Sequence, residues 1–117
     1  SKYNIVTPIT DIAELEADRA GTFVFFGKLK EKNLRDMNET VNLAKRGGRK
    51  VSSNNLWLNA TFEDDTGPII ATVDRFKYSK LGKPIVEDGK IGDWYLLKGQ
   101  IKKGFRLFYV EKWKKLS

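Results

Sequence analysis

The chain has 117 residues, with 22 Lys and Arg against 15 Asp and Glu, so its formal net charge at pH 7 is +7. It contains no cysteine and no histidine, which excludes disulfides, thiolate metal sites and the side chain most used as general base and zinc ligand. This length suits one domain over 1–117. We expect a protein that is not an enzyme and that holds no metal or cofactor. Its positive charge favours a polyanionic partner.

The first 21 residues are predicted to form an N-terminal extension within this single domain. Residues 1–10 contain Val6, Pro8 and Ile9 and are expected to be extended. A short helix is expected over 11–19, because acidic residues occupy its first turns and Gly21 follows its end. No apolar run approaches the roughly 20 residues that span a bilayer, and no signal-peptide pattern opens the chain. We therefore expect a soluble cytoplasmic protein with no membrane partner.

A first strand is predicted over 22–30, where β-branched and aromatic residues are followed by alternation. Gly27 within it predicts a bulge or a sharp bend. Residues 31–55 then form a long insertion between two strands, and connections of that length are usually functional or mobile. Its apolar spacing allows a helix over 34–45, and an extension of the flanking strands into a hairpin is equally allowed.

The insertion carries a basic tip, Lys45-Arg46-Gly47-Gly48-Arg49-Lys50. Four cations around two glycines favour a flexible arm that binds phosphates, and a solvated loop without a partner is the alternative.

A second and a third strand meet at Asp64-Asp65-Thr66-Gly67, which is typical of a hairpin turn. The acidic residues of this turn resemble a metal site, but oxygen-only sites need more ligands, so we expect a solvated turn. Alternation places the core side chains at Leu58, Ala60, Phe62, Ile69, Ala71 and Val73. It places the outward side chains at Trp57, Asn59, Thr61, Ile70, Thr72 and Asp74.

The last third predicts a turn or two of helix within 75–88, interrupted at Gly82 and Pro84. A fourth strand follows over 94–101, with Tyr95 and Leu97 inward and Gly99 at a bulge. After a basic turn that contains Lys102 and Lys103, a fifth strand is predicted over 105–113. Its expected core residues are Leu107 and Tyr109, with Trp113 or Val110.

These elements predict an all-β fold with small helices, a five-stranded Greek-key barrel. Two runs, Phe62-Glu63-Asp64-Asp65-Thr66-Gly67-Pro68-Ile69 and Leu96-Leu97-Lys98-Gly99-Gln100-Ile101, resemble the OB-fold nucleic-acid-binding family. That family includes OB domains of bacterial DNA polymerase III alpha subunits, anticodon-binding domains and replication protein A-type modules. The runs look most similar to the polymerase III alpha version. The long 31–55 insertion departs from the family's pattern.

The resemblance implies binding of single-stranded nucleic acid with little sequence preference, DNA in preference to RNA, across the second and third strands and the loops that flank them. Other replication proteins are possible partners, and the protein is expected to be a monomer or a small homo-oligomer. A protein-interaction role, with Trp57 and Ile70 as an apolar patch, and an RNA or tRNA role are the alternatives. Carried onto this chain, the nucleic-acid-binding residues are Trp57, Asn59, Thr61, Ile70, Thr72, Lys45, Arg46, Arg49, Lys50, Lys102, Lys103 and Phe105.

Overall fold

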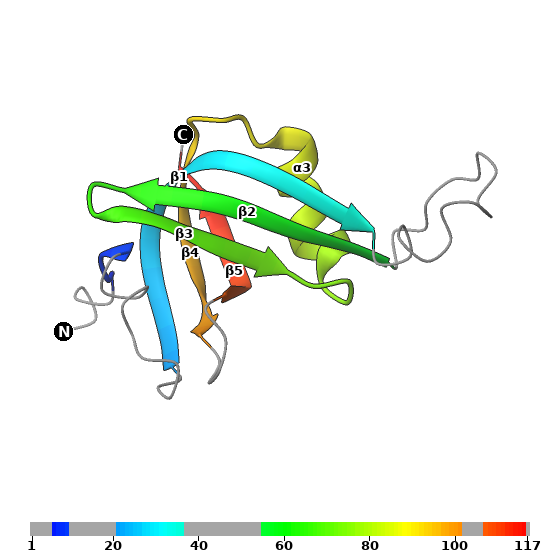
Figure 1. The fold of residues 1–117 in the computed structure, drawn as a ribbon, viewed down its shortest axis with the longest axis horizontal. Coiled ribbons are helices and arrows are strands. Elements are labelled where there is room, and N and C mark those ends of the chain that lie inside the picture. The colour runs from blue at the N-terminus through cyan, green and yellow to red at the C-terminus, as the bar shows by residue number, and fades with distance from the viewer. Residues whose placement is uncertain (1–5, 10–20, 37–54, 102–106, 117) are drawn as a thin grey trace.

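The structure is a computed structural model that describes residues 6–9, 21–36, 55–101 and 107–116 (Figure 1). The predicted helix at 11–19, the basic tip at 45–50 and the turn with Lys102, Lys103 and Phe105 lie outside the described residues. The described elements are β1 (Gly21–Asp36), β2 (Leu56–Asp64), β3 (Gly67–Val73), η3 (Tyr78–Gly82, one turn of π-helix), α3 (Lys83–Asp88), β4 (Trp94–Ile101) and β5 (Phe108–Lys115).

The five strands form a closed barrel in the order β1-β2-β3-β5-β4, which confirms the predicted five-stranded closed sheet. Every neighbouring pair is antiparallel except β3 and β5, which run parallel. Closure depends on β1, whose first half pairs with β4 and whose second half pairs with β2 (Figure 1). This is the order expected of a Greek-key OB barrel.

Strand β1 is longer than predicted, because it continues through Asp36 instead of ending at Lys30. Residues 31–36 pair with 56–61 of β2, so the hairpin alternative is confirmed there and a helix beginning at Leu34 is wrong. Pairing with β2 satisfies the backbone groups of this stretch, and that outweighs its helical apolar spacing.

The irregularity in β1 also lies elsewhere than predicted. The register shifts between Leu29 and Glu31, not at Gly27. Gly27 is instead a point of close approach, since a Cβ there would lie 2.8 Å from the Cβ of Phe62 and 2.8 Å from the Phe25 ring. Its small size lets β1 pass over the core.

The core contains the predicted inward residues of β2, β3 and β4, all at most 5% exposed. In β5 the prediction was wrong at Leu107 and Tyr109, which are half-buried, whereas Phe108 is buried. It was right at Val110, which is buried, and at Trp113, which packs against the core. A bulge explains the error: the β4–β5 register shifts between Lys98 and Gly99, which changes the inward phase between Val110 and Trp113.

The segment between β3 and β4 closes one end of the barrel with η3 and α3. This confirms the helical turns predicted within 75–88. Pro84 lies in the first turn of α3, where its missing N–H costs no hydrogen bond. The Lys32 ammonium donates to the carbonyls of Val86 (3.0 Å) and Gly89 (2.7 Å) at the other end of α3. A cation there satisfies carbonyls that the helix leaves unpaired.

The N-terminal lead-in is extended at Val6 and Thr7, and the backbone N–H of Thr7 donates to the Val24 carbonyl at 2.7 Å. Ile9 is fully buried in the core. None of the helices in the described ranges has the length and apolar character to cross a membrane.

Candidate nucleic-acid interface

One outward-facing residue from each strand forms a continuous line across the barrel, which we call the polar row. Strand pairing places Asn33 opposite Asn59, Asn59 opposite Thr72, Thr72 beside Tyr109, and Tyr109 opposite Gln100. All five side chains carry hydrogen-bonding groups. The polar row therefore brings together residues as distant in sequence as Asn33 and Tyr109.

Two of the predicted binding residues lie in this row, but they play different parts. Asn59 is half-buried, whereas Thr72 is only 1% exposed although it lies on the predicted outward side of β3. The Thr72 hydroxyl donates to Asn59 Oδ1 at 2.9 Å. Thr72 therefore orients the Asn59 amide. Thr72 itself lies between its paired neighbours, Asn59 on β2 and Tyr109 on β5.

Trp57 lies beside the polar row at the start of β2, opposite Arg35 of β1. Its side chain is half-buried, and its indole Nε1 is buried without a hydrogen-bond partner among the described residues. The ring is thus only partly available for stacking. Arg35, at the paired position on β1, is exposed.

Thr61 and Ile70 form a cross-strand pair on the other side of the polar row. Ile70 is 45% exposed and Thr61 is half-buried, so both remain reachable from outside. The Asn59–Thr72 pair separates Ile70 from Trp57. These two apolar side chains consequently do not form the continuous patch that a protein-docking role was predicted to use.

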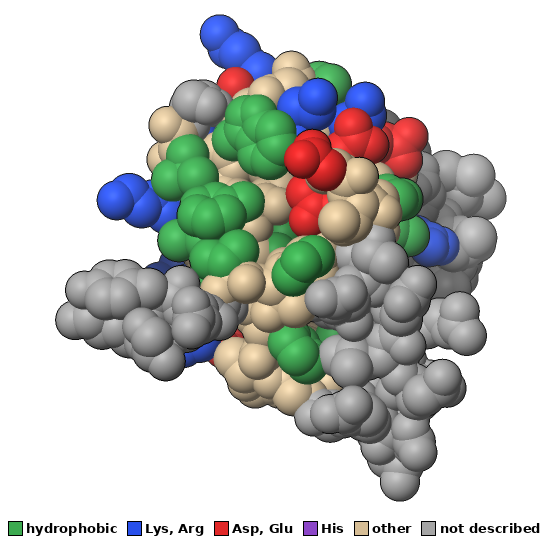
Figure 2. All heavy atoms as spheres, turned by 90° about the vertical axis from the view of Figure 1, so that its left-hand side faces the viewer, with side chains coloured by type: hydrophobic (Ala, Val, Ile, Leu, Met, Phe, Trp, Pro, Cys, Tyr) green, Lys and Arg blue, Asp and Glu red, His purple; other side chains and the backbone are tan. Residues whose placement is uncertain are grey.

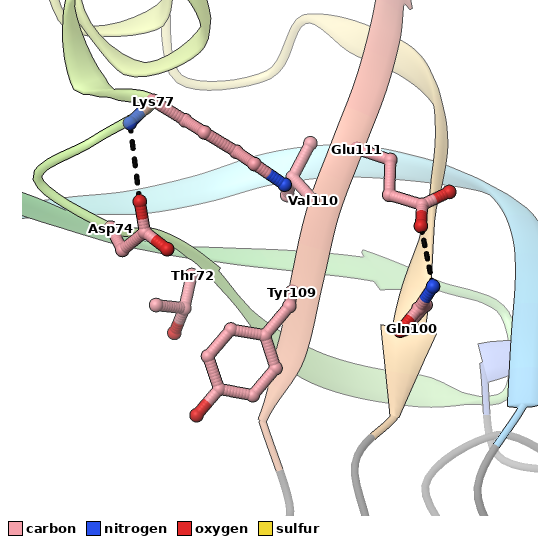
Figure 3. Close-up of a pocket in the computed structure, with 7 residues that line it drawn as sticks. All are labelled: Thr72, Asp74, Lys77, Gln100, Tyr109, Val110 and Glu111. Carbon is pink, nitrogen blue, oxygen red and sulfur yellow. Dashed lines mark hydrogen bonds between the residues drawn. The ribbon is translucent and has the colours of Figure 1, made fainter.

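A pocket opens between β3, β5 and β4 at the end of the polar row (Figure 3). Its cavity has a volume of about 160 Å³. Its charged members are Asp74, Lys77 and Glu111. The full lining is Thr72, Asp74, Lys77, Gln100, Tyr109, Val110 and Glu111.

Both predicted basic segments join this face, although their own residues lie outside the described ranges. The segment 37–54 follows β1 and precedes β2, next to the Arg35–Trp57 pair. The segment 102–106 connects Ile101 to Leu107, next to the Gln100–Tyr109 pair. The described part of the face is close to neutral, because Arg35 and Lys77 are balanced by acidic residues there.

The acidic turn between β2 and β3 is structural. Asp64 accepts hydrogen bonds from the backbone N–H and hydroxyl of Thr66, and from the Ile9 N–H at 2.9 Å. Partial burial raises the pKa of Asp64, but the hydrogen bonds from Thr66, Ile9 and Gly67 outweigh burial and leave that pKa below its usual value. Both oxygens of the Asp64 carboxylate accept hydrogen bonds from neighbouring parts of the chain, so this side chain stabilises the turn.

A second exposed surface lies on the other half of the barrel, where β1 pairs with β4. We call it the apolar face and define it as Val24, Phe26, Trp94 and Leu96, which are outward neighbours in the register. Phe26 is 42% and Trp94 36% exposed. Figure 2 shows apolar side chains gathered on this side of the molecule. Lys98, Lys112 and Lys114 line the groove that continues from it.

Sequence reasoning missed several residues of the interface. Asn33 and Arg35 fell in the predicted insertion, and Tyr109 was assigned to the core. The signal that could have placed Tyr109 outward is the bulge at Gly99, since a bulge makes the phase of the paired strand change. No sequence signal points to Lys77, which reaches the pocket from the connection after β3.

Comparison of the sequence with protein-family models and with curated proteins finds no match. Comparison of the structure does find similar chains. One belongs to the S. pombe Stn1–Ten1 complex, with a TM-score of 0.68 and 11% sequence identity over 99% of this chain and 79% of that chain. The fold is the same. A chain of the yeast Stn1 and Ten1 structure matches with a TM-score of 0.56 and 11% identity, over 82% of this chain and 43% of that chain. At this identity the likeness concerns the fold alone.

Proposed function

We propose that this protein is a non-enzymatic OB-fold module that binds single-stranded DNA in replication, recombination or repair. One observation carries the proposal: the polar row and Trp57 lie on the outer face of the barrel, and both predicted basic segments join the barrel at the edges of that face. OB barrels use this surface and these loops to bind oligonucleotides. The narrower resemblance to polymerase III alpha OB domains is part of the proposal.

The distribution of charge suggests different roles for the outer face of the barrel and for the two basic segments that join it. The described face offers amides, a tyrosine and part of a tryptophan ring, which suit hydrogen bonding and stacking with exposed bases. It lacks an excess of cations, so the neutralisation of phosphates falls to the segments that contain 45–50 and 102–103. The part of the affinity that comes from phosphate contacts should then depend strongly on salt, whereas the part that comes from base contacts should not.

One of the structures that resemble this chain is described as a complex of Stn1 with Ten1. Assembly with a second protein is therefore included in the proposal. The oligonucleotide face and a protein-binding face would be separate, because the barrel presents the polar row and the apolar face on different strand pairs.

The test is a fluorescence-anisotropy titration of the full chain with a labelled 15-mer of thymidine at two salt concentrations. For three or four phosphate contacts the affinity should fall roughly 20- to 50-fold between 50 and 200 mM salt. A duplex and an RNA 15-mer of matched sequence serve as comparisons, and single-stranded DNA should bind best. Absence of binding at low salt, or binding that salt does not change, would contradict the proposal.

A second candidate function, docking of a partner protein, is favoured by the exposed apolar face. The lysines along its groove would suit a segment that is both apolar and acidic. A pulldown that compares the wild-type chain with Phe26→Ser tests this. Partners that persist after nuclease treatment and disappear with Phe26→Ser support it. Partners that are lost after nuclease treatment would instead be bound through nucleic acid, which would favour the nucleic-acid-binding function.

A further inference from the structure

The pocket at the end of the polar row has the wrong charge for a phosphate. It contains two carboxylates, on Asp74 and Glu111, and one ammonium, on Lys77. A net negative charge repels an anion, and carboxylates act as acceptors only. The pocket is instead suited to a neutral group that offers hydrogen-bond donors.

Both carboxylates are held in place, and each keeps an oxygen for a ligand. Asp74 Oδ1 accepts from the backbone N–H groups of Phe76 (3.0 Å) and Lys77 (3.1 Å), and Glu111 Oε2 accepts from Gln100 Nε2 (2.6 Å). Within the described ranges, no hydrogen bond or ion pair involves Asp74 Oδ2 or Glu111 Oε1. These acceptors are therefore oriented before a ligand arrives.

The remaining side chains complete the shape of the pocket. Figure 3 shows the Tyr109 ring next to Thr72, with the Lys77 ammonium reaching towards β5. An aromatic wall favours a planar ligand that can stack on it. The volume of about 160 Å³ is below the roughly 300 Å³ of pockets that take drug-sized molecules, so it suits a single planar ring system.

A lysine donor and carboxylate acceptors that line the same pocket complement one base in particular. The Watson–Crick edge of guanine presents O6 as an acceptor beside N1–H and the N2 amino group as two adjacent donors, and lysine to guanine O6 is a common specific contact. Thymine offers a single N3–H donor between two carbonyls. Guanine is thus the one base whose edge offers an acceptor to the ammonium of Lys77 and, next to it, two adjacent donors to the carboxylates of the pocket.

We infer that this pocket binds an unpaired guanine base, stacked on Tyr109, with Lys77 on O6 and Asp74 or Glu111 on the N1–H and N2 amino donors. The inference rests on the proposed single-strand binding and deepens it. It assigns a base preference to a face that the sequence predicted to bind with little preference. The phosphates remain outside the pocket.

The test compares a thymidine 15-mer with versions that carry one central guanine, adenine, cytosine or hypoxanthine. Guanine should bind roughly 5- to 100-fold more tightly than thymine, the range of one good bidentate base contact. Hypoxanthine, which lacks the N2 amino group, should lose most of that gain. Equal affinities for all five oligomers overturn the guanine pocket but leave the proposed function standing, and no binding to any oligomer overturns both.

Two conservative variants locate the effect. Asp74→Asn keeps an acceptor for the Phe76 and Lys77 N–H groups while it replaces the free oxygen, and Glu111→Gln does the same on β5. At least one should reduce the guanine preference, measured as the ratio of the affinities for the guanine and thymidine 15-mers, below about twofold. Glu87→Gln, exposed on α3, is the matched control and should keep the preference. A preference that survives both pocket variants overturns the assignment.

Discussion

The hydroxyl of Thr72 donates a hydrogen bond to Asn59 Oδ1 at 2.9 Å across the β2–β3 pair. Thr72 is buried and Asn59 is half-buried. The bond therefore fixes which end of the Asn59 amide turns outward, so that its NH₂ group, and not its oxygen, is offered to a ligand. A buried threonine thus sets the hydrogen-bonding character of the candidate interface at Asn59.

Thr72→Val should destabilise the protein by about 1 kcal/mol, because it removes the donor and leaves Asn59 Oδ1 without a partner. Urea unfolding followed by tryptophan fluorescence measures this. Thr61→Val on the same face is the control and should change stability by less than about 0.5 kcal/mol. Equal effects for both variants would show that the hydrogen bond contributes nothing specific.

Gly99→Ala should destabilise the barrel by about 2 kcal/mol or more, because the new Cβ would collide with the Tyr109 carbonyl and lie 2.7 Å from the Phe108 ring. Backbone cannot yield there without disrupting the β4–β5 pairing. Gly92→Ala is a useful comparison, since a Cβ there meets nothing within 4 Å and only its φ of +101° is unfavourable. We expect Gly99→Ala to be the more damaging of the two in thermal unfolding.

Asp64→Ala should cost stability at neutral pH and progressively less in acid. The pKa of Asp64 in the folded state is lowered, so its contribution is fully present above the unfolded pKa of about 3.9 and is lost as the pH falls through the folded value. The difference in melting temperature between wild type and variant should therefore narrow below about pH 4. Asp65→Ala, at the exposed neighbouring position, should show no such convergence. A difference that stays constant from neutral pH into strong acid would exclude this role.

Trp57→Ala should weaken binding of a thymidine 15-mer by about 1–3 kcal/mol, the usual contribution of a base-stacking aromatic. Because the protein half-buries the ring, circular dichroism must first establish that the variant folds. Trp94→Ala, on the apolar face, is the matched control and should bind the oligomer as wild type does. The reverse ranking would place the nucleic acid on the apolar face.

Charge reversal at Arg46 and Arg49 should weaken binding of every single-stranded sequence alike. It should also reduce the slope of log affinity against log salt by about 0.7 for each phosphate that the variant no longer neutralises. Lys83→Glu with Lys90→Glu, exposed around α3, carries the same change of net charge and is the control. If both double variants weaken binding equally, only the overall charge of the protein matters and the basic tip does not bind phosphates directly.

Local pattern was sufficient for much of the fold. Alternation along β2 and β3 placed Leu58, Phe62 and Ile69 in the core, and the Asp64–Gly67 run placed the hairpin between them. Such features depend on residues next to one another in the chain. The absence of histidine and the charge of +7 likewise led, from composition alone, to the expectation of a non-enzymatic protein with a polyanionic partner.

Tertiary structure decided what depends on partners distant in sequence. The outward position of Tyr109 follows from a bulge created by pairing with Gly99, and the burial of Thr72 follows from neighbours on β2 and β5. The pocket exists because barrel closure brings Gln100 and Glu111 beside Asp74 and Lys77. A period of two gives the side of a strand on which a residue lies, whereas the register between strands determines which residues meet across it.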